Sequence, residues 1–182
     1  MNIFYRSARE FKDLHTITGI ALLLALGVIF DLFFSIQVSP SLSFGFGYLI
    51  TALLGMLYGP VMAGIAGGIG DVIEFMIKPT GVFFFGFTLN AILGGILYGL
   101  CFYKYKVTWL RCIIAKTAAN IFINIGLNTY WISILMGKGF FALLGPRIAK
   151  NLVLLPVEII VLYIVTSQIA RVLRKAAPSP RE

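Results

Sequence analysis

Residues 68–81, GIGDVIEFMIKPTG, carry two carboxylates and one amine at the end of a long apolar stretch. Asp71 and Glu74 are three residues apart and Lys78 follows four residues later, so all three share one face of a helix. Such carboxylates can accept hydrogen bonds from the N–H donors of a ligand or carry protons. Charged groups inside a membrane normally face a cavity or a partner, whereas near its surface they extend to water. Both readings stay open: a ligand-binding Asp71 with Glu74 beside it, or a pair that only reaches the interface.

A stripe of amides in the segment AANIFINIGLNTYW is the second candidate group. Asn120, Asn124 and Asn128 recur every four residues and share one helical face, and Tyr130 and Trp131 follow them. An unpaired amide in hydrocarbon costs several kcal/mol, whereas an interhelical amide hydrogen bond contributes only about 0.6 kcal/mol. A single asparagine would usually only connect two helices. Three in register that end in aromatic residues favour a polar wall for a flat heterocycle.

Cations precede the last apolar segment, in the motif GPRIAKN. Arg147, Lys150 and Asn151 fall at the start of that helix, where an acidic ligand would meet both cations and helix N–H groups. Lys150 serves equally well as an interfacial anchor. Asn90 is a fourth amide within an apolar segment, and Asp31 falls where it could face the same cavity.

No catalytic set is evident in the sequence. His15 is the single histidine, no Ser–His–Asp or metal-ligand spacing occurs, and no Walker loop is present for ATP hydrolysis. Cys101 and Cys112 lack metal-type spacing and are interpreted as free thiols. We predict a protein that binds but does not transform its ligand, with no cofactor and no metal. Lys116 and Glu158 are isolated charges that could pair with each other or with other helices.

The composition is that of a membrane protein. Of 182 residues 59% are hydrophobic and 12% charged, and the mean hydropathy is +0.95. Soluble domains have about 45–50% apolar and about 25% charged residues. The net charge of +8 could suggest nucleic acid, but the basic residues follow a membrane-orientation pattern instead.

We predict an all-α fold with six transmembrane helices in a single membrane domain. The N-terminal segment 1–16 and the polar tail 170–182 flank a bundle at 17–169, and the polar start with no cleavage site argues that the first apolar segment is a true span. Pro60 in YGPVMAG divides the long stretch 48–76 into two helices, of which the first is short. The segment SIQVSPSLSFGFG is expected to be a loop or a broken segment, and GKGFFALLGPR is expected to be a loop. The other spans are predicted at 17–34, 83–103, 113–136 and 148–169.

The distribution of Lys and Arg predicts that both termini are cytoplasmic. Most cations lie on the side of the termini and of the connector between the fourth and fifth spans. They are Arg6, Arg9, Lys12, Lys104, Lys106, Arg111, Arg171, Arg174, Lys175 and Arg181. The opposite loops carry only Lys78, Lys138, Arg147 and Lys150.

The whole pattern resembles the substrate-binding (S) components of energy-coupling factor (ECF) vitamin transporters. ALLLA gives Ala21 and Ala25 the AxxxA spacing with which these components dock on their transmembrane coupling subunit. MLYGPVMAGIAGGIGDVIEFMIKPTG, FTLNAILGGILYG and PRIAKNLVLLPVE are similar to the folate-specific members, and the likeness covers nearly the whole chain.

The resemblance implies high-affinity capture of folate at the plasma membrane of a bacterium, by a multi-pass protein. It implies a module of one coupling subunit and two ATPases as partners, and no nucleic acid. Asp71 would accept from the N–H donors of the pterin with Glu74 nearby, and Arg147 and Lys150 would meet the glutamate tail. Other expected contacts are the pocket amides and stacking aromatics: Asn90, Asn124, Asn128, Asn151, Tyr130 and Trp131.

Two alternatives remain open on the sequence. An S component for thiamine or riboflavin would keep the fold, although cationic thiamine would not need Arg147. A small stand-alone ion-coupled transporter could use Asp71 and Glu74, but no inverted repeat is evident.

Overall fold

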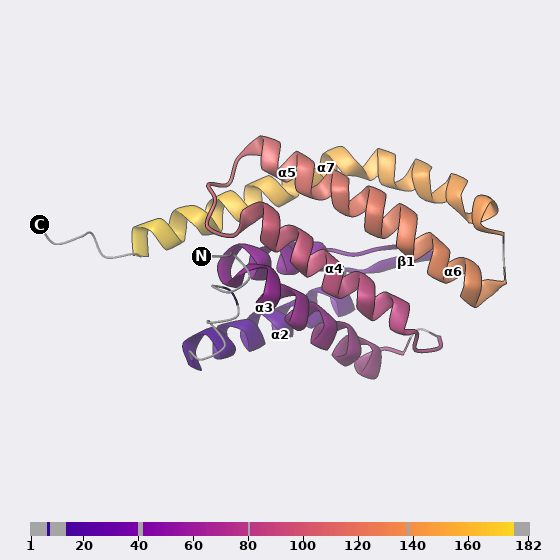
Figure 1. The fold of residues 1–182 in the computed structure, drawn as a ribbon, viewed down its shortest axis with the longest axis horizontal. Coiled ribbons are helices and arrows are strands. Elements are labelled where there is room, and N and C mark those ends of the chain that lie inside the picture. The colour runs from indigo at the N-terminus through magenta and orange to yellow at the C-terminus, as the bar shows by residue number, and fades with distance from the viewer. Residues whose placement is uncertain (1–6, 8–13, 40–41, 80, 138, 177–182) are drawn as a thin grey trace, which may run out of the picture.

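The computed structural model is a bundle of helices with one short two-stranded ribbon (Figure 1). It describes residue 7 and residues 14–39, 42–79, 81–137 and 139–176, so most of the predicted segment 1–16 and the end of the tail lie outside the described residues. In chain order the elements are α2 (Leu14–Phe34), β1 (Ile36–Ser39), β2 (Leu42–Phe44), α3 (Gly47–Ile77), α4 (Phe85–Phe102), α5 (Trp109–Ala118), the π-helix η2 (Ala119–Leu127), α6 (Asn128–Met136) and α7 (Phe140–Ala176).

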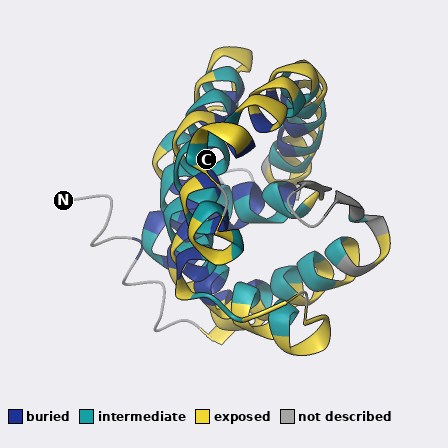
Figure 2. Ribbon diagram, turned by 90° about the vertical axis from the view of Figure 1, so that its right-hand side faces the viewer, coloured by how far each residue is buried: buried dark blue, intermediate teal, exposed yellow. Residues whose placement is uncertain are grey.

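Five helical stretches in the described part of the chain are long and apolar enough to cross a membrane. They are 14–31, 47–77, 85–102, 109–136 and 140–173, the fourth being α5, η2 and α6 in direct succession. Large apolar side chains such as Leu22, Phe141 and Leu152 are exposed on them, and Figure 2 shows exposed residues along the outer faces of the helices. A lipid environment accounts for this exposure, so the predicted helical membrane class is confirmed.

Helix α3 is broken in its middle, at the motif YGPVMAG. Gly59 has φ 85° and ψ 179°, a conformation that glycine adopts without strain, and Pro60 brings no N–H to the helical ladder. The hydroxyl of Ser7 bridges the break: it donates to the carbonyl of Tyr58 at 2.7 Å and accepts from the N–H groups of the two residues after Pro60, at 3.2 and 3.3 Å. The interruption predicted at Pro60 is therefore present.

Both halves of α3 pack along α4, and they meet near its C-terminal end, where the backbone of Pro60 lies against Gly99. A Cβ on Gly55, before the break, would lie 2.6 Å from the backbone nitrogen of Gly99. After the break, a Cβ on Gly67 would lie 2.6 Å from the carbonyl oxygen of Ala91, eight positions further from that end. The second half therefore runs antiparallel to α4. The first half runs with α4, because Thr51 lines a cavity with Asn90 and Gly94 while Gly55 lies against Gly99, so the chain reverses at Gly59.

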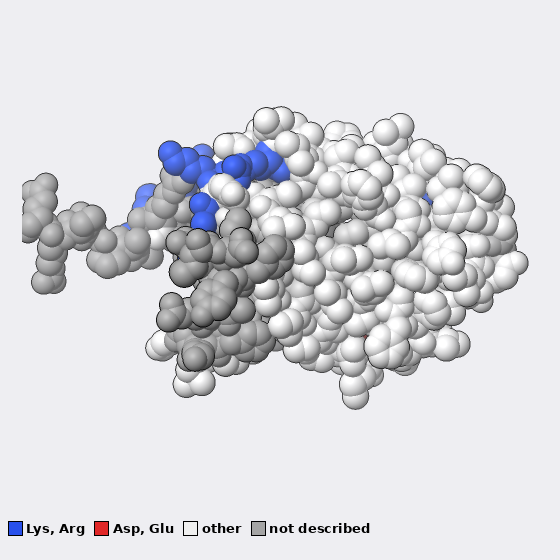
Figure 3. Space-filling view, in the orientation of Figure 1, with Lys and Arg blue, Asp and Glu red and all other residues white. Residues whose placement is uncertain are grey.

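The elements are arranged so that loops alternate between two ends of the bundle. The end that holds Ser7, the α3 break, residues 103–108 and the last turns of α7 is called the connector end. The end that holds β1–β2, Gly81 and Gly137 is called the hairpin end. In Figure 1 the connector end is on the left and the hairpin end on the right. Figure 3 shows Lys and Arg gathered at the connector end, where Lys104, Lys106, Arg171 and Lys175 are exposed.

The core is formed where α3, α4, α5 and α7 meet. Tyr98 and Phe102 of α4 stack on each other, with ring centroids 6.3 Å apart, and the small residues Cys112 and Ala115 of α5 are fully buried beside them. Leu162 of α7 completes this cluster. The close approach of these four helices brings polar groups from each of them to one place.

Two regions predicted as loops are ordered elements instead. Strands β1 and β2 pair as an antiparallel ribbon with a register shift between Gln37 and Ser39. Residues 140–147, expected as a loop, are the first turns of α7, which contains both Pro146 and Pro156. Membrane helices tolerate proline because neighbouring groups satisfy the freed carbonyls, so the Gly-Pro signal did not end the helix.

Candidate functional site

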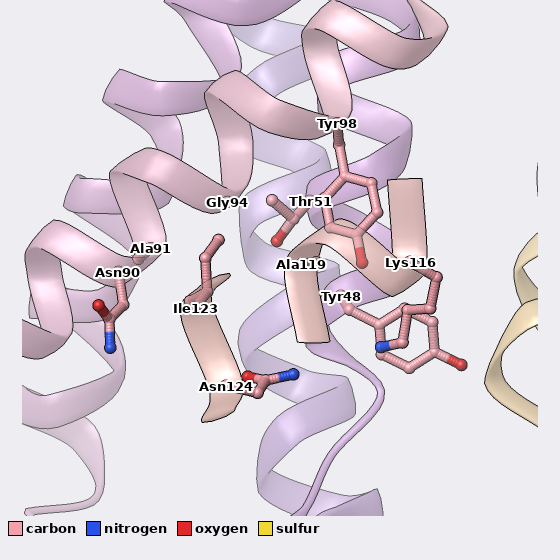
Figure 4. A pocket seen from close by; sticks show the side chains of 10 residues that line it. All are labelled: Tyr48, Thr51, Asn90, Ala91, Gly94, Tyr98, Lys116, Ala119, Ile123 and Asn124. Carbon is pink, nitrogen blue, oxygen red and sulfur yellow. The ribbon is translucent and has the colours of Figure 1, made fainter. Parts of the chain in front are cut away.

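A cavity of about 140 Å³ lies between the first half of α3, α4, α5 and η2 (Figure 4). Pockets that hold a whole drug-sized ligand measure roughly 300–1,000 Å³, so this cavity has room for a ring rather than for a long molecule. Its lining residues are Tyr48, Thr51, Asn90, Ala91, Gly94, Tyr98, Lys116, Ala119, Ile123 and Asn124. Of the residues predicted from the sequence, Asn90 and Asn124 are among them.

Asn90 is held by Trp131 at one side of the cavity. The indole nitrogen of Trp131 donates to Oδ1 of Asn90 at 3.2 Å. An indole N–H can only donate, so the oxygen of the Asn90 amide must face Trp131. The two N–H groups of the amide are then the donors that Asn90 offers to the cavity.

A chain of polar groups crosses the other side of the cavity, from α5 to α7 and back to η2. Lys116 pairs with Glu158 at 3.3 Å, which confirms one of the two pairings considered for these isolated charges. Asn120 donates to the same Glu158 oxygen at 3.2 Å, and Asn124 donates to Oδ1 of Asn120 at 2.7 Å. Because a carboxylate only accepts, the direction of every bond follows from Glu158. The oxygen of the Asn124 amide is not used by these bonds and is the acceptor that Asn124 can offer.

Arg147 adjoins this chain through the backbone of η2. Its Nη1 donates to the carbonyl oxygen of Asn124 at 3.2 Å, and its own carbonyl accepts from Asn151 at 2.8 Å. The N–H of Asn128, which would bond to Asn124 in an α-helix, bonds to Ile123 instead. The π-helix therefore turns a backbone carbonyl toward the guanidinium. Such segments occur often at functional sites.

Aromatic and hydroxyl groups complete the cavity wall. The amine of Lys116 lies 3.5 Å from the ring centroid of Tyr48, which is a cation–π contact. The hydroxyl of Tyr98 has no hydrogen-bond partner among the residues that the structure describes, although this residue is only 3% exposed. In Figure 4 it points into the space bounded by Thr51 and Lys116.

The carboxylates of α3 form a separate group. Asp71 accepts a hydrogen bond from Thr88 of α4 at 2.7 Å, and Glu74 is close enough to Asp31 and Asp71 to interact with their charges. Thr88 and Asn90 are two residues apart, and about 200° separates such positions on a helix. Asp71 and the cavity therefore lie against different faces of α4.

Asp31 has a local role that the sequence did not indicate. Its Oδ1 accepts from the backbone N–H of Gly47, the first residue of α3, at 3.1 Å. A carboxylate at the beginning of a helix satisfies an otherwise unpaired donor and complements the helix dipole.

The remaining predicted residues lie at the surface or near the hairpin end. Trp131 packs against Phe84 and Tyr130, with ring centroids 5.5 and 5.1 Å away, and Tyr130 is half exposed. Oδ1 of Asn128 is buried without a hydrogen-bond partner in the described part of the chain. Lys150 follows Arg147 on α7 and is partly buried.

Ala21 and Ala25 lie on the surface of α2. Both are exposed, four residues apart on one helix face, with the large apolar side chains of Leu22 and Leu26 exposed beside them. This face has small side chains at its centre and large apolar side chains on either side, an arrangement that suits close helix–helix packing.

Sequence reasoning missed most of the aromatic and charged lining. Tyr48, Thr51 and Tyr98 carried no signal, because tyrosine and threonine are ordinary in membrane helices. Lys116 did carry a signal, because a lysine within an apolar segment must find a partner. Predicting its pairing with Glu158 would have located the α5 wall of the cavity.

A bundle of membrane helices that encloses a cavity with amide, aromatic and cationic walls defines a solute-binding membrane protein. The family model for the ECF transporter, substrate-specific component, matches residues 15–166, and the chain belongs to this family. It is thus a multi-pass component of a bacterial membrane transporter, in a family of transport proteins rather than enzymes.

The chain is similar to proteins of known function. It is 38% identical to the folate transporter FolT of Clostridium novyi (strain NT), over 84% of this chain and 88% of that protein. It is 31% identical to the folate transporter FolT of Leuconostoc mesenteroides, over 67% of this chain and 69% of that protein. A crystal structure of FolT bound with folic acid matches with a TM-score of 0.78 and 34% identity, covering 84% of this chain and 91% of that one.

Proposed function

We propose that this protein is the folate-binding component of an ECF transporter, which captures folate outside the cell and passes it inward with an ATP-driven module. The observation that carries the proposal is the likeness to FolT bound with folic acid, at 34% identity over most of both chains. Similarity of that extent in both sequence and fold supports a shared ligand.

Folate is a flat pterin joined through a benzoyl group to a glutamate tail, and the site has matching parts. The cavity has room for the ring system and presents amides to its edge from Asn90 and Asn124. Arg147 lies beside the cavity as a cation for the carboxylates of the tail, with Lys150 one turn further along α7. Tyr48 and Tyr98 line the cavity and Trp131 is hydrogen-bonded to Asn90, so these aromatic rings are the candidates for stacking.

We propose Asp71 and Glu74 as a second contact with the ligand, apart from the cavity. The affinity of variants for folic acid tests this contact separately. Asp71→Asn keeps the size of the side chain and an oxygen for Thr88. A loss of folic acid affinity of tenfold or more would assign Asp71 to the ligand, because a charged hydrogen bond contributes roughly that much. A change within about twofold would assign Asp71 to the α3–α4 contact alone.

Six spans with both termini in the cytoplasm are the proposed topology. The reversal of α3 at Gly59 supports two antiparallel segments in place of one, although the first, with about 12 residues, would rise only about 18 Å. The cations at the connector end support its cytoplasmic location. The hairpin end would then face outward, next to Arg147 and Trp131.

The partners proposed are one transmembrane coupling subunit and two ATPases. Ala21 and Ala25 are the proposed contact on α2. Ala21→Leu together with Ala25→Leu should leave folic acid binding unchanged and abolish uptake, because bulky side chains prevent close packing with the coupling subunit. Ala170, a partly buried alanine of α7 near the connector end, supplies the matched Ala→Leu control.

Titration calorimetry of the detergent-purified chain against folic acid, thiamine and riboflavin tests the ligand. Saturable binding of folic acid alone, with affinity lowered in Arg147→Ala, is the expected result. Binding of another vitamin would retain the family and refute folate, and binding of none would refute the cavity as a vitamin site.

A further inference from the structure

We propose that the cavity recognises the edge of the bound heterocycle that carries its oxo group. Tyr98 and Lys116 are the hydrogen-bond donors to the oxo oxygen. This inference rests on the proposed function and adds an orientation: the oxo edge faces α5, and the amino edge faces Asn124. It also names two specificity residues, Tyr98 and Lys116, that the sequence analysis did not assign to the binding site.

The directions of the hydrogen bonds around the cavity carry the argument. The side-chain oxygen of Asn90 accepts a hydrogen bond from Trp131, so Asn90 presents its N–H groups to the cavity. Lys116 has three N–H donors and no acceptor, and one of them is used by Glu158. Tyr98 adds a buried hydroxyl that has no hydrogen-bond partner among the described residues. Three of the polar groups in the wall therefore offer hydrogens to whatever occupies the cavity.

Asn124, in contrast, offers the cavity a hydrogen-bond acceptor. One N–H of its amide is donated to Asn120, and one N–H of Asn120 is donated to Glu158, so neither bond uses the oxygen of Asn124. The oxygen of Asn124 is then the acceptor that the cavity presents from η2. In Figure 4, Asn90 lies at one side of the cavity, Tyr98 and Lys116 lie at the other, and Asn124 lies between them on a third wall.

A 2-amino-4-oxopteridine matches this pattern in one orientation. Its oxo group and the ring nitrogen N5 on the same edge accept hydrogen bonds, while its 2-amino group and the N3–H donate them. An oxo oxygen carries more negative charge than a ring nitrogen and suits the ammonium of Lys116. Exchanging the oxo group for an amino group would place a donor opposite Lys116. Because the lysine ammonium has no acceptor, the two groups could not form a hydrogen bond.

Folic acid and aminopterin are the probes, because aminopterin differs from folic acid only by an amino group in place of the 4-oxo group. Calorimetry on the purified full chain should give roughly three- to tenfold weaker binding of aminopterin. Equal affinity for the two would overturn the inference. A wild-type chain that binds neither would refute the proposed function itself, which is a different result.

Two variants then assign the effect to residues. Tyr98→Phe removes only a hydroxyl, so it should weaken folic acid binding roughly three- to tenfold without lowering the melting temperature of the ligand-free chain. Lys116→Gln can turn its amide to accept, so it should narrow the preference for folic acid over aminopterin. Tyr163→Phe, on α7 against Trp109, is the matched control and should leave both affinities unchanged. Unchanged folic acid affinity in Tyr98→Phe overturns the role of Tyr98 even if Lys116→Gln does not fold.

Discussion

The buried ion pair between Lys116 and Glu158 allows one prediction of stability to be worked in detail. Glu158→Gln removes the negative charge but retains a side chain of the same shape, with an oxygen for Asn120. Lys116 is then left with its charge, and its side chain is only 2% exposed in a membrane-spanning segment. A buried charge without its counterion has no solvent to stabilise it, so the folded state should lose stability.

Removing one member of a buried pair costs about 3–5 kcal/mol. Glu158 is itself 20% exposed, which favours the lower end of this range. For a chain of 150–250 residues each kcal/mol corresponds to about 2–4 °C in melting temperature, so the expected decrease is on the order of 10 °C. The double variant Lys116→Met, Glu158→Gln removes both charges and should recover most of this loss, because paired buried charges contribute little net stability.

Thermal unfolding of the detergent-purified chain, followed by tryptophan fluorescence, measures these shifts. Wild type, both single variants and the double variant form a double-mutant cycle, and a coupling free energy above about 1 kcal/mol is expected for groups in contact. Tyr163→Phe again serves as the control. The reasoning is refuted if Glu158→Gln melts within about 2 °C of the wild type, or if the double variant melts no higher than the less stable single variant.

Three further predictions concern how the bundle is held together, each read from the melting temperature. Gly95→Ala should lower it by several degrees because the new Cβ would collide with the backbone of α3 at the carbonyl of Ala63, whereas Gly145→Ala, with no atom nearby, should not. Ser7→Ala should cost about 1–2 kcal/mol because two N–H groups and a carbonyl at the α3 break lose their partner; Ser167→Ala is the control, and equal melting temperatures for the two would contradict this role of Ser7. Asp31→Ala should cost about 0.5–2 kcal/mol through the unpaired N–H of Gly47, and a melting temperature unchanged from wild type would exclude this capping role.

Long apolar stretches and the positions of cations determined much of this protein without any structure. Long continuous apolar runs favour helices, since a helix in lipid satisfies its own backbone hydrogen bonds, and Pro60 after Gly59 indicated the break in α3, although the same Gly-Pro pair at 145–146 does not interrupt α7. The family likeness was also readable, because its motifs are local runs of residues. The asparagine spacing placed Asn120, Asn124 and Asn128 on one helical face, because residues four apart share a face in almost any helix, and Asn124 is the one of the three that lines the cavity.

Only the tertiary structure decided which polar groups face one another. The sequence gives no rotation of α4, so it could not show that Asp71 meets Thr88 on one face while Asn90 meets Trp131 on another. It likewise gives no sign that η2 widens into a π-helix and turns the carbonyl of Asn124 toward Arg147. Rotations and ladder shifts of this kind depend on the packing of all neighbouring helices together, and a linear pattern of residue types contains only the periodicity of one helix at a time.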